Sequence, residues 1–132
     1  MLVVDAAAVV AALVDEGRHG IWAHGLLGSD SLAAPHLMPV EVANILRRAV
    51  MAGDLSADAA ALAHADLLEL RVNLFPYAPF AARVWQLRGN VTAYDAWYVA
   101  VAEALGARFA TLDVRLSRAP GPKCRFEIPA GR

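Results

Sequence analysis

The sequence predicts one α/β domain built on a mainly parallel sheet. Short apolar runs alternate along the chain with helical segments of about ten residues or more, which is the pattern of βαβ units. Glycine, proline and aspartate separate these segments, and no internal repeat, linker or low-complexity stretch interrupts them. At 132 residues the chain is long enough for one hydrophobic core and too short for two. We therefore expect residues 1–132 to form a single domain.

The first half of the chain predicts two strands and four helices. An apolar opening strand ends at Asp5, and an alanine- and valine-rich helix follows it. Pro35 closes the second strand because proline cannot donate to the strand ladder. Gly53 ends the longer third helix, and Ser56 is a favourable N-cap for the next one. The expected elements are a strand at 2–4, helices at 6–14 and 21–27, a strand at 31–34, and helices at 39–52 and 56–70.

The second half predicts three strands and two helices. Pro76 closes the third strand, and Gly106 suits the left-handed position just beyond a helix C-terminus. A proline- and glycine-rich turn separates the last two strands. The expected elements are a strand at 72–75, helices at 80–87 and 92–105, and strands at 108–112 and 125–128.

Composition restricts the class of protein. Apolar residues make up 58% of the chain, above the usual ~45–50%, which indicates a fully buried α/β interior or an apolar face for a partner. No stretch approaches the ~18 apolar residues of a membrane span, and the early apolar run follows Asp5 without a basic leader. The single cysteine, Cys124, excludes an internal disulfide and a cysteine-based metal cage. We expect a cytoplasmic protein.

The charge balance does not by itself select a ligand. The net charge is −1, so no global positive field attracts nucleic acid. Eleven of the twelve basic residues are arginine, whose planar guanidinium suits phosphate contacts, although a GC-rich coding sequence would produce the same bias.

Four carboxylates occur in apolar surroundings where solvated charges are not expected: Asp5, Glu41, Asp95 and Asp113. Asp5 and Asp113 follow predicted strands, and ligands of α/β sheets gather at the carboxyl ends of the strands. Burial of a lone carboxylate costs several kcal/mol, and a cluster of four would repel itself unless a divalent cation lay among them. Oxygen ligands without histidine or cysteine favour Mg²⁺ or Mn²⁺ over Zn²⁺.

Each of these carboxylates also has a purely structural interpretation. Asp5 is a good N-cap for the helix at 6–14, and Thr92 with Asp95 fits a capping box. Glu41 could be an exposed position on its helix, and Asp113 an ordinary turn residue. The agreement of all four with one metal site is what favours the functional interpretation.

Four motifs occur in order along nearly the whole chain: Val3-Val4-Asp5, Pro39-Val40-Glu41-Val42 followed by Asn44 and Arg47-Arg48, Tyr94-Asp95-Ala96 with Tyr98, and Thr111-Leu112-Asp113 with Arg115. Together they resemble the PIN-domain family and, within it, the VapC toxins of bacterial toxin–antitoxin pairs. The third motif is the most specific. One departure is that members often carry serine or threonine shortly after the first aspartate, where this chain has Ala6-Ala7-Ala8, so a hydroxyl beside the site is missing.

The resemblance implies a five-stranded parallel sheet in the order 3-2-1-4-5 and a metal-dependent endoribonuclease. It implies that one or two Mg²⁺ or Mn²⁺ ions are held by the catalytic carboxylates Asp5, Glu41, Asp95 and Asp113. Such an ion would lower the pKa of a water for in-line attack on a phosphodiester. Asn44 lies three residues after Glu41 on the same helical face and could orient a carboxylate.

The resemblance also implies two kinds of partner. The arginines best placed by sequence to contact RNA phosphates are Arg47, Arg48, Arg115 and Arg118, each of which could equally be a surface charge. A VapB antitoxin would block the site, and a homodimer is implied by the family. Trp22, Leu26 and Leu27 fit a groove for that antitoxin, although Trp22 fits the core at least as well. The histidines (His19, His24, His36, His64) lack metal-ligand spacing, so we expect them to be structural or on the surface.

Two other classes of function remain as alternatives. A phosphoacceptor or phosphatase domain would need a lysine after a late strand or an Asp-x-Asp motif at Asp5, and the only lysine, Lys123, precedes the last expected strand. A non-catalytic PIN-like binding or regulatory module would be signalled by loss of acidic residues, and none of the four is lost. Metal-dependent RNA cleavage separates both alternatives from the main interpretation.

Overall fold

Five short strands form one parallel sheet in the order β3-β2-β1-β4-β5, in the computed structural model of residues 1–131. This confirms the predicted α/β fold class and strand order. Arg132, which we included in the expected domain, lies outside the described residues. The strands are β1 (Leu2–Val4), β2 (Leu32–Pro35), β3 (Val72–Phe75), β4 (Arg108–Ala110) and β5 (Phe126–Glu127).

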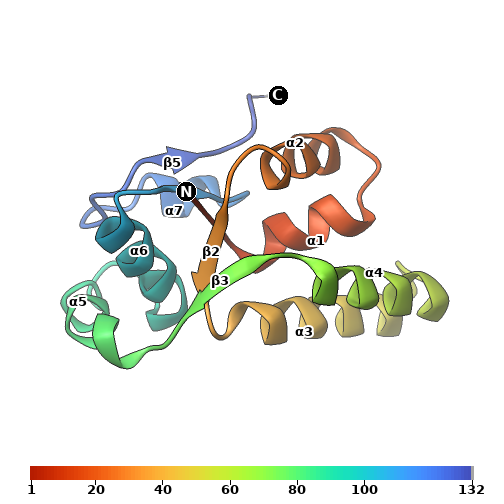
Figure 1. Cartoon of the computed structure of the whole chain (residues 1–132), viewed down its shortest axis with the longest axis horizontal. Coiled ribbons are helices and arrows are strands. Elements are labelled where there is room, and N and C mark those ends of the chain that lie inside the picture. Colours follow the sequence, from red (N-terminus) through yellow and green to blue (C-terminus); the bar gives the residue numbers. More distant parts are fainter. Residues whose placement is uncertain (132) are drawn as a thin grey trace.

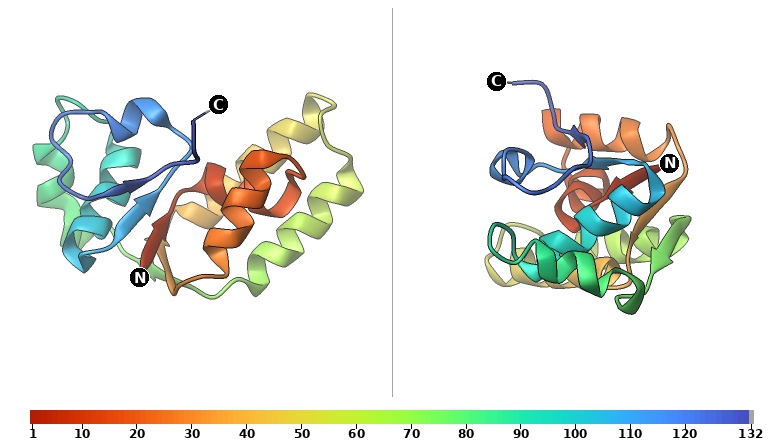
Figure 2. Two further views of the ribbon diagram at one scale, coloured as in Figure 1. Left: turned by 90° about the horizontal axis from the view of Figure 1, so that it is seen from above. Right: turned by 90° about the vertical axis from the view of Figure 1, so that its left-hand side faces the viewer.

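Helices cover the sheet in two groups (Figure 1). The long helix α6 packs across β1, β2 and β4, and α5 packs beside it, whereas α1 to α4 pack against one another. Figure 2 shows these two groups on opposite sides of the strands. The helices are α1 (Ala6–Val14), α2 (Arg18–Leu27), α3 (Met38–Met51), α4 (Ala57–Glu69), the 3-10 turn η1 (Ala78–Phe80), α5 (Ala81–Gln86), α6 (Ala93–Leu105) and α7 (Val114–Ser117).

The central strand and the helix that crosses it form the core. Every residue of β1 is at most 1% exposed, because neighbouring strands flank it on both sides and helices cover it. The α6 segment Tyr98–Ala102 is also buried throughout, and its small residues let the helix lie close to the sheet. The partly exposed β3 ends the sheet at one edge. Asp5 directly follows this buried strand, which places its carboxyl at the boundary between the core and the surface.

The close approach of α1 and α2 explains why position 20 is a glycine. A Cβ on Gly20 would lie 1.6 Å from the carbonyl oxygen of Asp15, a distance that no side chain can occupy. Gly25 of the same helix has nothing within 4 Å of the corresponding position. The first glycine is therefore a packing requirement, and the second is not.

Several predicted boundaries were wrong. Helix α2 begins at Arg18, whereas we expected residue 21. The prediction missed the first turn because that turn is polar and carries no apolar periodicity. The predicted helix at 80–87 is a 3-10 turn followed by the short α5. The fourth strand ends at Ala110, two residues earlier than expected, and the chain then turns into α7, which the prediction lacked. This four-residue helix buries only one apolar side chain, Leu116. A single buried residue gives no helical periodicity in the sequence, so the pattern could not predict α7.

The aromatic and aliphatic residues expected in an antitoxin groove lie against the core, but each is only partly buried, so the groove stays a prediction. Trp22, Leu26 and Leu27 of α2 are partly buried and pack on the main hydrophobic cluster. All four histidines are exposed, as expected. Within residues 1–131 no helix has the length and apolar character needed to cross a membrane.

Candidate active site

All four predicted carboxylates line one hollow of about 490 Å³ at the carboxyl end of β1. Asp5 comes from the end of this strand, and Glu41 and Asp95 come from the first turns of α3 and α6. Asp113 is the N-cap of α7. The predicted Asn44 and Arg48 line the same hollow, one and two turns after Glu41 on α3. These residues are far apart in sequence and meet because helices α3, α6 and α7 all begin near the carboxyl end of β1.

Asp5 has the structural role that the sequence allowed, and its carboxyl also lines the hollow, where its role as a metal ligand stays a prediction. Its Oδ1 accepts a hydrogen bond from the Ala8 amide at 2.9 Å, which makes it the N-cap of α1. Its Oδ2 accepts a hydrogen bond from the Thr111 hydroxyl at 2.5 Å, and the Thr111 Oγ1 in turn accepts the Asp113 amide at 3.0 Å. The two hydrogen bonds fix the orientation of the carboxyl group at the floor of the hollow.

Glu41 is held by a buried tyrosine. The Tyr98 hydroxyl donates to Oε1 of Glu41 at 2.6 Å. Burial, followed by this contact with Glu41, raises the pKa of Tyr98 above its usual range, so the hydroxyl remains a donor. The Tyr98 ring lies parallel to the ring of Phe109 at 5.6 Å between centroids, which fixes its position. One oxygen of Glu41 is therefore occupied.

Asp95 and Asp113 stand at helix N-termini. Thr92 caps α6 by accepting the Asp95 amide at 3.2 Å, so the expected cap exists and leaves the Asp95 carboxyl in the hollow. Asp113 Oδ1 caps α7 by accepting the Leu116 amide at 3.0 Å. Burial, and then the negative charge of Asp113, raise the pKa of Asp95. The structural and functional interpretations of these residues are therefore compatible.

The electrostatics of the hollow favour a bound cation. Burial is the largest cause that raises the pKa of Asp5 from 3.8 to about 6, and the charges of Asp95 and Glu41 add to it. The hydrogen bonds from Thr111 and Ala8 act in the opposite direction and do not compensate. Ionised carboxylates at neutral pH thus repel one another here, and a divalent ion would remove that repulsion.

The residues present fit a hard divalent ion in chemical type. The donors of the hollow are carboxylate and amide oxygens, with no histidine or cysteine among the lining residues. In the part of the chain that the structure describes, no three acidic, histidine or cysteine side chains are grouped as a ready-made metal cage.

The PIN-domain family model matches residues 2–122, which is almost the whole described chain. The chain belongs to the PIN-domain family. This PIN domain is 46% identical over 127 residues to Ribonuclease VapC1 of Mycobacterium tuberculosis, covering 96% of each chain. Two solved structures share its fold. PAE2754 from Pyrobaculum aerophilum has a TM-score of 0.70 at 27% identity, covering 95% of this chain and 81% of that one. VapBC2 from Rickettsia felis, bound to a DNA fragment from its promoter, has a TM-score of 0.67 at 13% identity, covering 96% and 97%.

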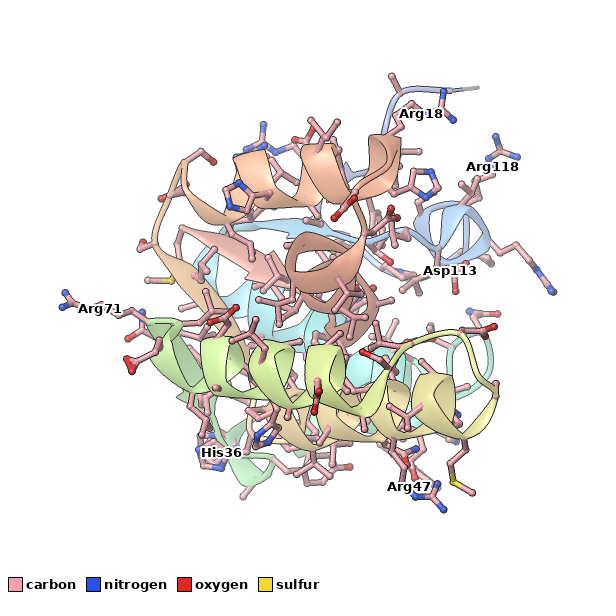
Figure 3. The ribbon with its side chains drawn as sticks, turned by 90° about the vertical axis from the view of Figure 1, so that its right-hand side faces the viewer. Arg18, His36, Arg47, Arg71, Asp113 and Arg118 are labelled. Atoms are coloured by element: carbon pink, nitrogen blue, oxygen red, sulfur yellow. The ribbon has the colours of Figure 1, made fainter. Side chains whose placement is uncertain are left out.

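The structure separates the four arginines that were predicted to contact RNA. Arg48 lines the carboxylate hollow of the PIN domain, and Arg115 lines an adjoining hollow that shares Asp95 and Asp113. Arg47 and Arg118 line neither hollow, and Figure 3 shows both extending away from Asp113. Sequence position alone did not distinguish the members of each pair.

Two hydroxyl residues of the PIN domain were not predicted as site residues. Ala6 and Ala7 line the hollow without a hydroxyl, and the hydroxyl that contacts Asp5 comes from Thr111 at the other end of the chain. The available signal for Thr111 was its place two residues before Asp113 at a strand end. The signal for Tyr98 was its spacing of three residues from Asp95, which puts both on one helical face.

Proposed function

We propose that this PIN domain is a Mg²⁺- or Mn²⁺-dependent endoribonuclease, the toxic component of a toxin–antitoxin pair. The observation that supports it most is that Asp5, Glu41, Asp95 and Asp113 line one hollow in a chain 46% identical to Ribonuclease VapC1. The raised pKa of Asp5 adds a physical reason for a cation at this place.

We assign each carboxylate a role in metal binding, supported by its contacts. Asp5 is oriented by Thr111 and Ala8, and the second oxygen of Glu41 is free of the Tyr98 hydrogen bond, so both residues present oxygens in fixed directions. Asp95 and Asp113 complete the ligand set from helix N-termini, and Asn44, which lines the same hollow, is assigned the role of orienting a carboxylate. When bound, the divalent ion supplies Lewis acidity and lowers the pKa of a water.

RNA would approach a hollow whose charged lining residues are four carboxylates and one arginine. Arg48 is the single basic residue lining it, and we assign to Arg48 a contact with a phosphate beside the cleaved bond. The exposed Arg47 and Arg118 would act only through long-range attraction, which salt screens.

We also propose a VapB-type antitoxin as the cognate partner and a homodimer as the assembled form. The support is the VapC name of the relative and the fold shared with VapBC2, an assembly solved on its promoter DNA. Co-expression with the protein encoded by the adjacent gene, followed by light scattering of the purified complex, tests both parts. A monomer that captures no such protein would contradict them.

The decisive experiment for the nuclease is RNA cleavage by Asp95→Asn. The purified, partner-free chain is incubated with total cellular RNA in Mg²⁺, in Mn²⁺ and in EDTA. Cleavage should require metal and fall by about 100-fold or more in the variant, because several kcal/mol of charge stabilisation are lost. The matched control is Asp58→Asn, since Asp58 also lies in the first turn of a capped helix but lines neither hollow.

The outcome also decides between an enzyme and a binding module. Metal-dependent cleavage that survives in Asp58→Asn and disappears in Asp95→Asn supports the nuclease. Intact RNA from a folded protein that fails to bind Mn²⁺ would overturn it and leave the non-catalytic module.

A further inference from the structure

Two hollows meet at the acidic site. The second hollow, of about 430 Å³, shares Asp95 and Asp113 with the first and is otherwise lined by the 90–92 loop, α7 and Ala119. The two carboxylates thus stand between a hollow bordered by α3 and another bordered by α7. A phosphodiester cleaved at these carboxylates has a nucleotide on each side of it. The second hollow is where one of the two neighbours has room.

Positive charge is placed on both sides of this acidic centre. Arg48 lines the first hollow and Arg115 the second, and each is the only basic residue in its lining. Neither takes part in an ion pair among residues 1–131, in contrast to Arg83 and Arg108, which bind Glu103 and Glu127. Exposed arginines without carboxylate partners are available to bind phosphates.

The second hollow combines an apolar wall with an amide. Val91 and Leu116 line the hollow with the small part of each that stays exposed, 8% and 5%, and the exposed Asn90 lines it with them. Within the described residues the Asn90 side-chain amide makes no hydrogen bond. A Cβ on Gly121 would lie 3.3 Å from the Asn90 Nδ2, so the passing backbone limits the positions of the amide. An unengaged amide beside apolar surface can hydrogen-bond the edge of an unstacked base.

We propose that this second hollow is a base-binding subsite for the nucleotide next to the cleaved phosphate. Asn90 reads the edge of that base, Val91 and Leu116 contact its face, and Arg115 binds the phosphate beyond it. The inference rests on the ribonuclease function proposed above. It makes Asn90 the residue that sets base preference at one position beside the cut.

The first test maps cleavage sites in a random-sequence RNA pool. Wild type should prefer one base at a position adjoining the cut, and Asn90→Ala should reduce that preference about threefold or more while leaving the preferences at other positions unchanged. Asn90→Asp, which replaces the donor with an acceptor, should change which base is preferred. An equal profile for wild type and Asn90→Ala overturns the subsite.

The second test measures binding without cleavage. Fluorescein-labelled oligomers of about 12 nucleotides (rA, rC and rU) are titrated in EDTA. Arg115→Ala should weaken binding about fivefold and lower the salt slope by about one, and Asn90→Ala should reduce the differences in affinity among the three oligomers. Arg71→Ala is the control, because Figure 3 places Arg71 on the far side of the molecule from Asp113.

The two tests distinguish failure of the subsite from failure of the nuclease. Binding that depends on Arg115 and Asn90 without cleavage in any metal would refute the nuclease, and with it a subsite beside a cut, and would leave the second hollow as a selective RNA-binding site. Cleavage with equal effects of Arg115→Ala and Arg71→Ala, and no effect of Asn90→Ala, would refute the subsite alone. Absence of both cleavage and selective binding would refute both.

Discussion

The partly buried Asp5 carboxyl should make the metal-free protein less stable at neutral pH than in mild acid. Its pKa is raised from 3.8 to about 6, chiefly by burial. The folded state therefore retains this proton at pH values where the unfolded state has lost it, so the free energy of unfolding falls as the pH rises from about 4 to about 6. At about 1.4 kcal/mol for each pKa unit, the total loss is about 3 kcal/mol.

Asp5→Asn removes this titration and should stabilise the metal-free chain at pH 7.5. An asparagine oxygen can still accept from the Ala8 amide, but its NH₂ group replaces the acceptor for the Thr111 hydroxyl. That mismatch costs about 1 kcal/mol, so the net gain is about 2 kcal/mol. Near pH 4 and below, wild type is neutral at this position, so the gain is lost and the variant becomes less stable by up to about 1 kcal/mol, the cost of the mismatch.

Urea unfolding in EDTA at several pH values measures this difference directly. Asp58→Asn serves as the control, since Asp58 is exposed. Addition of Mg²⁺ or Mn²⁺ at about 100 times its Kd should then stabilise wild type by about 2.7 kcal/mol and leave Asp5→Asn unchanged. An Asp5→Asn protein that is less stable than wild type by the same amount at every pH would refute the reasoning.

Other predictions concern the support of the site and the packing of the helices. Tyr98→Phe removes the donor to Glu41 but keeps the stacked ring, so Mn²⁺ affinity by titration should fall about tenfold with little change in Tm. An unchanged affinity would show that Tyr98 does not position the carboxylate. Gly20→Ala should destabilise the fold by about 1–3 kcal/mol or more, because its methyl group meets the Asp15 carbonyl. Gly25→Ala should stabilise it by up to ~1 kcal/mol, both measured by urea unfolding; equal effects would contradict the close helix contact.

Local patterns were sufficient to predict most of the elements and the identity of the four carboxylates. Some features depend only on neighbours within a few residues, so they can be recognised before the fold is known. These features are the end of the first strand at Asp5 and the helix caps at Ser56 and Thr92. The strand order came from the family resemblance and not from the pattern itself. The short α7 was missed because its four residues contain no complete period.

The contacts that orient the carboxylates were decided by the tertiary structure alone. Thr111 lies 106 residues from Asp5, and Tyr98 lies 57 residues from Glu41, yet each pair is joined by a hydrogen bond. Such pairs depend on which strands are neighbours in the sheet and on how α6 crosses it, and neither is encoded in a local spacing.

The same distinction applies to the arginines and to the second hollow. The sequence by itself determined that Arg47 and Arg48 are adjacent on one helix, and that an acidic motif precedes Arg115 and Arg118. Only the packing of α3 and α7 around the ends of β1 and β4 decided which member of each pair lines a hollow. Composition and periodicity report burial and secondary structure, whereas a binding surface is made by the relative placement of elements that are distant in the chain.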